Sequence, residues 1–327
     1  MRALFYASLA VVPWVVVTLL LRWLINVEEW PVGLVGTLSR VVTLPLLGAW
    51  ILGTGMGWRR LRPRGRLGWL LLMGTISIVI NLAWFAAVGW TTATNMAVLI
   101  RFDVLFVVLI GACLGLERIG PAQIVLVPVM LFGLALLTEI QRFDFGSHAV
   151  GDLMTIVTAL GLAANAFIIR HIMQVMDEAS VALYNHAISM LGFVALALAA
   201  GDFARVDEVL GTPAAWLPIA ALGVLVAVSL PLYYVALGRM DVWKLRLFML
   251  SGPVLCGVVE WPLWGGWFSA MQWLGAAVIV AGLAVLIRIE SRGRPQPPTA
   301  ESYEEESSAP ATVSALQPQP CRKDPNA

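Results

Sequence analysis

The sequence predicts an all-α integral membrane protein with ten transmembrane helices. Of its 327 residues, 60% are hydrophobic and only 13% are charged, and the mean hydropathy is +0.85. Soluble domains are about half apolar and about a quarter charged, so this composition indicates a chain whose solvent is largely lipid. The apolar residues also form separate runs of about 20 residues, the length that an α-helix needs to cross a bilayer.

Ten such runs follow one another along the chain, separated by short connections. The first run, which begins at Leu4, is long enough to span and is not closed by the small residues of a signal-peptide cleavage site. Prolines within later runs are compatible with membrane helices because neighbouring helices satisfy the freed carbonyl groups. The predicted spans are 4–25, 34–53, 67–89, 93–114, 121–140, 152–171, 179–200, 214–237, 243–264 and 270–288.

Arginines are distributed unevenly between the two sides of the predicted bundle. The connection WRRLRPRGR, between the second and third spans, carries five of them, whereas the opposite side carries only Arg142 and Arg205 beside several acids. Basic residues stay on the cytoplasmic side, so we expect a multi-pass protein of the cytoplasmic (inner) cell membrane with both termini in the cytoplasm. Residues 291–327 are rich in Pro, Ser and Glu, a composition that predicts a disordered cytoplasmic tail.

The chain also contains an internal repeat. WFAAVGWTTA (84–93) is similar to YYVALGRMDV (233–242), and each segment ends one span and opens the next. Five spans in each copy, an odd number, would place the second copy upside-down relative to the first. Inverted repeats are common in secondary transporters, with the substrate site near the midplane between the copies. The sequence therefore predicts two five-helix repeats, at 1–142 and 143–290.

These motifs resemble the drug/metabolite transporter superfamily, in its ten-span type with two EamA-like repeats. Trp14, Arg22 and Arg40 match early positions of the first repeat, and Glu117 in GLERIGPAQ matches the acid that follows the fourth span. Pro253 and QWLGAAVIVAGLAVL match the second repeat. The resemblance covers residues 10 to 288. It implies a transporter whose fourth and ninth spans lie near a central cavity.

The sequence departs from the family pattern at two positions. Asp103, with Arg101 beside it, stands where the family usually has the proline that the second repeat keeps at Pro253. The acid expected near Gly266 is missing, and Glu260 lies about two turns earlier, within the span. Substrate specificity therefore does not follow from the resemblance.

Arg101 and Asp103 stand in the middle of the fourth predicted span, in NMAVLIRFDVLFVVLIGACLG (95–115). Each charge at the centre of a membrane helix costs about 2.5–3.5 kcal/mol on insertion scales, so it must find a partner or line water. Side chains two residues apart point about 200° apart around a helix and cannot easily neutralise each other. Each charge therefore needs a partner from another helix, or a ligand.

The ninth predicted span, VWKLRLFMLSGPVLCGVVEW, supplies candidate partners. One hypothesis is that Arg101, Arg246 and Lys244 face the cavity and bind an anionic group of the substrate. Asp103 and Glu260 would then hold these cations in place or exchange protons. The alternative is a set of interhelical ion pairs that fixes packing without touching substrate. Lys244 could also extend its stem to the membrane interface.

Five further residues are weaker candidates for the substrate site, and each has a structural alternative. Arg40 could extend to the outer surface, Asn81 could bond neighbouring helices together, and His186 could be a hydrogen-bonded packing residue. The family resemblance places the aromatics Trp84 and Tyr234 near the cavity, although packing would also explain them.

Several classes of function receive no support from the sequence. It has no HExxH, Walker or G-x-S-x-G motif, so we expect neither an enzyme nor transport driven by ATP within this chain. The cysteines Cys113, Cys256 and Cys321 are far apart, and no metal or other cofactor is expected. A net charge of +1 argues against a nucleic-acid partner.

The expected function is alternating-access export of a small polar metabolite, anionic or zwitterionic, with protons as a candidate coupling ion. The expected partners are the lipid bilayer and this small molecule. Two alternatives remain: a flippase of a lipid-linked or amphipathic molecule, and a non-transporting membrane scaffold that acts through its tail. The spacing in GACLG (111–115) permits close helix approach and hence a homodimer, which nothing else in the sequence supports.

Overall fold

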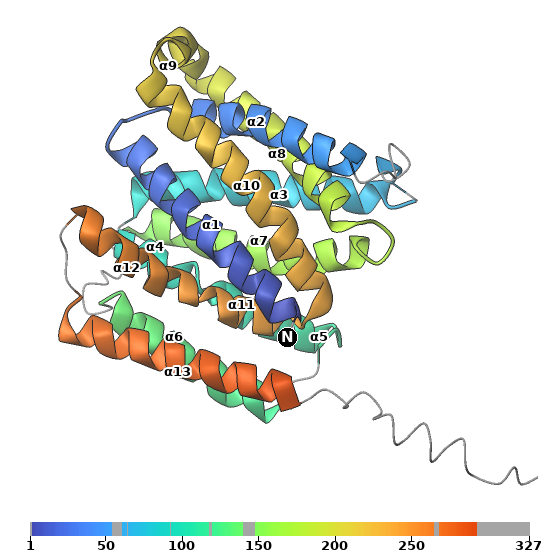
Figure 1. Cartoon of the computed structure of the whole chain (residues 1–327), viewed down its shortest axis with the longest axis vertical. Coiled ribbons are helices and arrows are strands. Elements are labelled where there is room, and N and C mark those ends of the chain that lie inside the picture. The colour runs from blue at the N-terminus through green and yellow to red at the C-terminus, as the bar shows by residue number, and fades with distance from the viewer. Residues whose placement is uncertain are drawn as a thin grey trace, which may run out of the picture. The chain divides into compact units, whose positions relative to one another are not determined.

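In the computed structural model, the regular structure of the described residues is entirely helical (Figure 1). The described ranges are 2–53, 61–63, 65–91, 93–117, 120–139, 148–264 and 268–292. Residues 1–288 form one compact unit, and all packing described below lies within it. The helices are α1 (Arg2–Asn26), α2 (Val32–Gly53), α3 (Leu67–Trp90), α4 (Ala93–Leu99), α5 (Phe102–Cys113), α6 (Pro121–Leu137), α7 (Ala149–Ile172), α8 (Glu178–Ala200), η3 (Asp202–Arg205), α9 (Val206–Gly211), α10 (Pro213–Arg239), α11 (Val242–Met249), α12 (Ser251–Trp264) and α13 (Ala270–Arg292).

Eight helical segments of the described chain are long and apolar enough to cross a membrane. Two more apolar helices, α5 and α6, are shorter than these. Large apolar side chains such as Leu109, Ile124 and Leu191 are exposed on the outside of the helices, where a soluble protein would have polar ones. The chain is therefore a multi-pass membrane protein whose outer apolar surface is covered by lipid.

The fourth and ninth predicted spans each contain a break between two helices, which the sequence did not predict. The first break separates α4 from α5 and the second separates α11 from α12. At each break the amide bonds to the carbonyl three residues back, from Arg101 to Val98 and from Leu250 to Leu247. Pro253 explains the second break, because it has no N–H to donate to the Met249 carbonyl. The first break has no proline and lies instead beside the charged residues.

The two halves of the chain have matching helix boundaries. The pairs Ala93 and Val242, Phe102 and Ser251, and Pro121 and Ala270 begin α4 and α11, α5 and α12, and α6 and α13, and each pair is 149 residues apart. Packing partners match as well: α3 packs on α7 and α8, as α10 packs on α1 and α2. In Figure 1, α1 lies beside α10, and α6 beside α13. Helices at equivalent positions therefore have equivalent neighbours.

Close approach between helices depends on glycine at a few positions. A Cβ atom on Gly275 of α13 would lie 2.5 Å from the Gly133 carbonyl oxygen of α6, and one on Gly282 would lie 2.6 Å from Met130. The order of these contacts shows that α6 and α13 are antiparallel. Gly111, from the GACLG spacing, faces Phe167 of the same chain, and Gly115 has a φ of +63° in a turn. These two glycines therefore serve folding of the chain itself.

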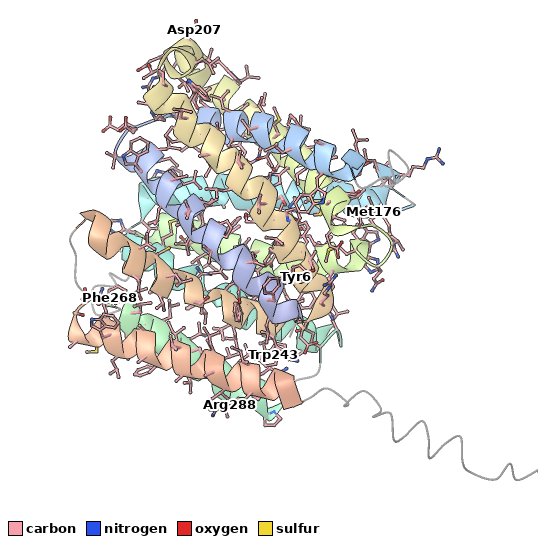
Figure 2. All side chains as sticks on the ribbon, in the orientation of Figure 1. Tyr6, Met176, Asp207, Trp243, Phe268 and Arg288 are labelled. Atoms are coloured by element: carbon pink, nitrogen blue, oxygen red, sulfur yellow. The ribbon has the colours of Figure 1, made fainter. Side chains whose placement is uncertain are left out.

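The core lies between the helices, where their side chains interdigitate (Figure 2). Its largest fully buried side chain is that of Tyr234 on α10. Arg239, the last residue of α10, lies 4.8 Å over the ring of Tyr6 on α1. The buried polar residues of the described chain include Asp103 on α5, Asn165 on α7 and His186 on α8.

Candidate functional site

A buried ion pair joins the two broken helices. Nη1 of Arg246 on α11 lies 3.0 Å from Oδ2 of Asp103 on α5, and the two side chains are 11% and 2% exposed. Nη2 of Arg246 donates a hydrogen bond of 2.8 Å to the Leu162 carbonyl of α7. The Arg246 guanidinium also lies 5.7 Å from the centre of the Tyr233 ring. Asp103 thus has the partner from another helix that its position requires, and the partner belongs to the opposite repeat.

Several buried polar atoms in and beside this pair make no hydrogen bond to the described residues. Arg101 is the residue before α5, at the break itself, and its guanidinium is within electrostatic range of Asp103 and Arg246. Among the described residues, the buried atoms of this group without a hydrogen-bond partner are Nε of Arg101, Nε of Arg246 and Oδ1 of Asp103. Buried polar groups are nearly always paired, so this position is suited to water or a polar ligand. Two cations face one carboxylate here, which favours an anion.

A network of neutral polar groups continues from Tyr233 into the bundle. The Tyr233 ring packs against the Tyr234 ring at 5.8 Å, and the Tyr234 hydroxyl accepts a hydrogen bond of 2.7 Å from Asn185 of α8. The Ser77 hydroxyl of α3 donates to Oδ1 of Asn185 at 2.6 Å and accepts from the amide of Asn165 of α7 at 2.9 Å. Four helices therefore meet at hydrogen bonds that fix their relative positions.

A third buried cation, Arg40, lies between α2 and α8. Nε of Arg40 donates to the Ser189 hydroxyl at 3.1 Å, and Nη1 donates to the Gly36 carbonyl at 3.0 Å. The guanidinium stacks 4.0 Å over the Phe193 ring. His186, one turn before Ser189, is 9% exposed, and neither of its ring nitrogens has a hydrogen-bond partner among the residues that the structure describes.

Comparisons with known proteins agree with this architecture. The model of the EamA-like transporter family matches the chain twice, over residues 1–139 and 149–288. The chain belongs to the EamA-like transporter family. It is therefore a membrane transporter of the drug/metabolite type. Among solved structures, 26 chains match. One of them, titled "Crystal structure of protein", is 20% identical, covers 90% of this chain and 99% of its own length, and has a TM-score of 0.72. No curated protein matches.

Two other predicted residues of this EamA-like transporter, Lys244 and Asn81, bond to partners outside the ion pair. Nζ of Lys244 lies 2.7 Å from Oδ2 of Asp241 at the start of α11, so it is held at the end of that helix. Asn81 donates to the Ser77 carbonyl of its own helix at 2.6 Å. Trp84 is half-buried on α3. The side chain of Glu260 lies outside the described residues.

Glu117 connects the two repeats of the transporter, a role that the sequence does not indicate. Oε1 of Glu117 accepts hydrogen bonds from the Val242 amide at 2.6 Å and from Arg170 of α7 at 2.9 Å. Burial raises the pKa of the Glu117 carboxyl, although the amides of Val242 and Trp243 oppose that rise. The family resemblance identified this acid. Its role depends on the start of α11 lying next to Glu117 in space, which the sequence does not show.

Asp152 makes a similar connection at the other end of α7. It accepts hydrogen bonds from the Thr91 hydroxyl and from the side-chain amide of Asn95, whose nitrogen lies 3.0 and 3.1 Å from the two carboxylate oxygens. The two ends of α7 are thus tied to the beginnings of α4 and α11, the short halves of the broken helices. Hydrogen bonds therefore connect α7 to the short half of each broken helix.

Proposed function

We propose that this transporter exports a small polar metabolite, anionic or zwitterionic, across the cytoplasmic membrane by alternating access. The observation that carries the proposal is the buried group of Arg101, Arg246 and Asp103 at the helix breaks, with unpaired polar atoms and an excess of one positive charge. A negative group of the cargo would supply the missing charge. It would also accept the unused hydrogen bonds.

The proposed architecture is ten membrane crossings in two inverted repeats, 1–142 and 143–290. It is supported by the 149-residue register between equivalent helices and by the exchange of their packing partners. Equivalent helices α6 and α13 are antiparallel, as expected when a two-fold axis in the membrane plane relates the repeats. In this arrangement α4 with α5, and α11 with α12, are single crossings interrupted near the midplane. Both termini would lie in the cytoplasm.

Broken helices offer a physical reason for binding anions at this depth. The N-terminus of a helix carries a partial positive charge, and α5 and α12 both begin at the breaks. Arg101 immediately precedes α5 and adds a full charge at the same place. The cargo's negative group would therefore bind beside Arg101, while the rest of the molecule contacts the Tyr233 and Tyr234 side of the network.

Proton coupling would operate through Asp103. Protonation of this carboxylate would weaken its ion pair with Arg246 and leave the guanidinium available to the anionic cargo. Release of the proton would restore the pair and displace the cargo. Proton and anion would thus bind together and leave together, and export would be driven by the outward gradient of the cargo.

The direct test is uptake by the purified full-length protein in liposomes. Labelled amino acids and organic acids should accumulate saturably and more rapidly when a pH gradient supplies protons on the side of the cargo. Labelled cationic amines should not be transported. Selective transport of the amines, with none of the acids, would reject the proposal.

One observation favours the amphipathic-cargo alternative. A cavity of about 250 Å³ opens between α1, α11, α12 and α13, and its lining is almost entirely apolar. The lining includes Val12 and Val280, which are exposed on the lipid-facing surface, and Phe248 and Ser251 beside the second break. A flippase would use such a lateral opening for an acyl chain. Reconstituted protein that moves a fluorescent anionic lipid between leaflets, but no soluble acid, would favour this function.

A further inference from the structure

The space between α2 and α8 contains a cation and an imidazole that the proposed transport site does not use. Arg40 is not paired with a carboxylate in the part of the chain that the structure describes, and both nitrogens of His186 lack partners. The two helices are antiparallel, because Gly33 lies close to Ala197 and Gly36 close to Phe193. Each of the two polar residues lies eight residues, or about 12 Å, from the start of its helix. Both are therefore well inside the membrane.

The Arg40 guanidinium is held in one orientation. The Gly36 carbonyl and the Ser189 hydroxyl each accept one of its hydrogen bonds, and the Phe193 ring covers one face. Gly36 has no side chain at the place where Phe193 packs, and a Cβ there would lie 2.1 Å from the ring. Two of the five N–H groups of a guanidinium are used by these contacts, so three remain for a ligand.

His186 lies one turn before Ser189 on α8. Its carbonyl accepts a hydrogen bond of 3.3 Å from the Ser189 hydroxyl, and its ring is within electrostatic range of Arg40. A neutral imidazole has one N–H donor, and leaving that donor unpaired in a membrane interior is costly. An anion beside Arg40 would accept this hydrogen bond and neutralise the guanidinium at the same time.

We propose that Arg40 and His186 form an anion-binding site that takes one carboxylate or phosphate group between α2 and α8. The chemical class of the ligand follows from the guanidinium, whose remaining donors match two oxygens of an oxyanion. The site is separate from the ion pair of Asp103 and Arg246. That the bound group belongs to the cargo rests on the proposed function. Binding itself does not depend on transport.

The test uses full-length protein in lipid nanodiscs with ¹⁵N-labelled histidine. The chain has three histidines, so the imidazole spectrum is simple, and His186→Asn assigns the signal of His186. Sodium acetate and inorganic phosphate are the probes, with sodium chloride at equal ionic strength as the reference. The His186 signal should shift saturably with acetate or phosphate, and the signals of His148 and His171 should not.

Arg40→Gln should weaken the apparent affinity for the oxyanion at least about tenfold, because a charge-assisted fork is lost. Arg205→Gln, on the exposed η3, is the matched control and should leave the affinity unchanged. A His186 signal that does not move in folded wild-type protein would overturn the site, and no variant is needed for that result. A shift that chloride reproduces, or that survives in Arg40→Gln, would show an adventitious ion only and overturn it as well.

The same protein in liposomes separates the two proposals. Transport of acids without any oxyanion effect on His186 would reject this site and leave the proposed function standing. A saturable shift at His186 without transport of any acid would do the reverse.

Discussion

Replacing one member of the buried Asp103–Arg246 pair should be far more damaging than replacing both. The pair is 3.0 Å apart and nearly inaccessible, so Arg246→Gln leaves a carboxylate with no cation at that distance. Removing one partner of such a pair costs about 3–5 kcal/mol, because the remaining charge stays buried and uncompensated. The double variant Asp103→Asn/Arg246→Gln removes both charges of the pair and should recover most of this loss.

The two single variants should also differ from each other. Asp103→Asn keeps Arg246 charged, and the Leu162 carbonyl and the Tyr233 ring remain as its neighbours. An anionic cargo can therefore stabilise Asp103→Asn, whereas it cannot replace the missing cation in Arg246→Gln. Thermal unfolding in detergent, with and without the transported acid, measures both effects. Single variants that each lose less than about 1 kcal/mol, with no coupling in the double variant, would show a solvated pair and refute the reasoning.

Three further predictions follow from the packing and the connections of α7 and the tail. Burial raises the pKa of Glu117 in the folded state. The stability that Glu117 contributes is therefore largest below about pH 4.5 and is lost as the pH rises through the folded-state pKa. Glu117→Gln should make the unfolding temperature less dependent on pH in this range. The control Glu208→Gln should act in the opposite direction, because the hydrogen bond from Arg205 lowers the pKa of Glu208 and its contribution is lost as the pH falls. Gly275→Leu should separate α6 from α13 and cost about 1–3 kcal/mol by overpacking, and an unfolding temperature equal to wild type would contradict the close approach. Deletion of 295–327 should leave uptake in liposomes unchanged, whereas loss of function with intact membrane insertion would favour a scaffold.

Much of the fold could be predicted because the membrane imposes a simple length rule on apolar segments. The predicted span 179–200 differs by one residue at its start from α8, and 270–288 begins where α13 begins. The breaks at Arg101 and Leu250 could not be predicted in this way. Hydropathy depends on side chains, whereas the breaks are changes in which backbone carbonyl accepts each amide's hydrogen bond. Their equivalence emerges only when the two repeats are compared in space.

The site could be predicted in part, for a different reason. Charge in a bilayer needs a partner, and this rule alone indicated that Asp103 must meet a residue of another helix, with Arg246 among the candidates. The rule did not decide between Arg246 and Lys244, because the choice depends on which way α11 rotates, and Lys244 pairs with Asp241 instead. The roles of Glu117 and Asp152 depend on contacts across more than fifty residues, which no local pattern encodes.

Initial rates of uptake in liposomes, compared between wild type and Arg101→Gln, test the central claim most directly. Arg101 belongs to no ion pair in the described structure, so its removal should leave folding and membrane insertion largely intact. If its charge binds the anionic cargo at the break, the rate at low substrate concentration should fall at least about tenfold, which corresponds to one lost charge-assisted hydrogen bond. An Arg101→Gln transporter that is inserted, folded and as fast as wild type would contradict the account.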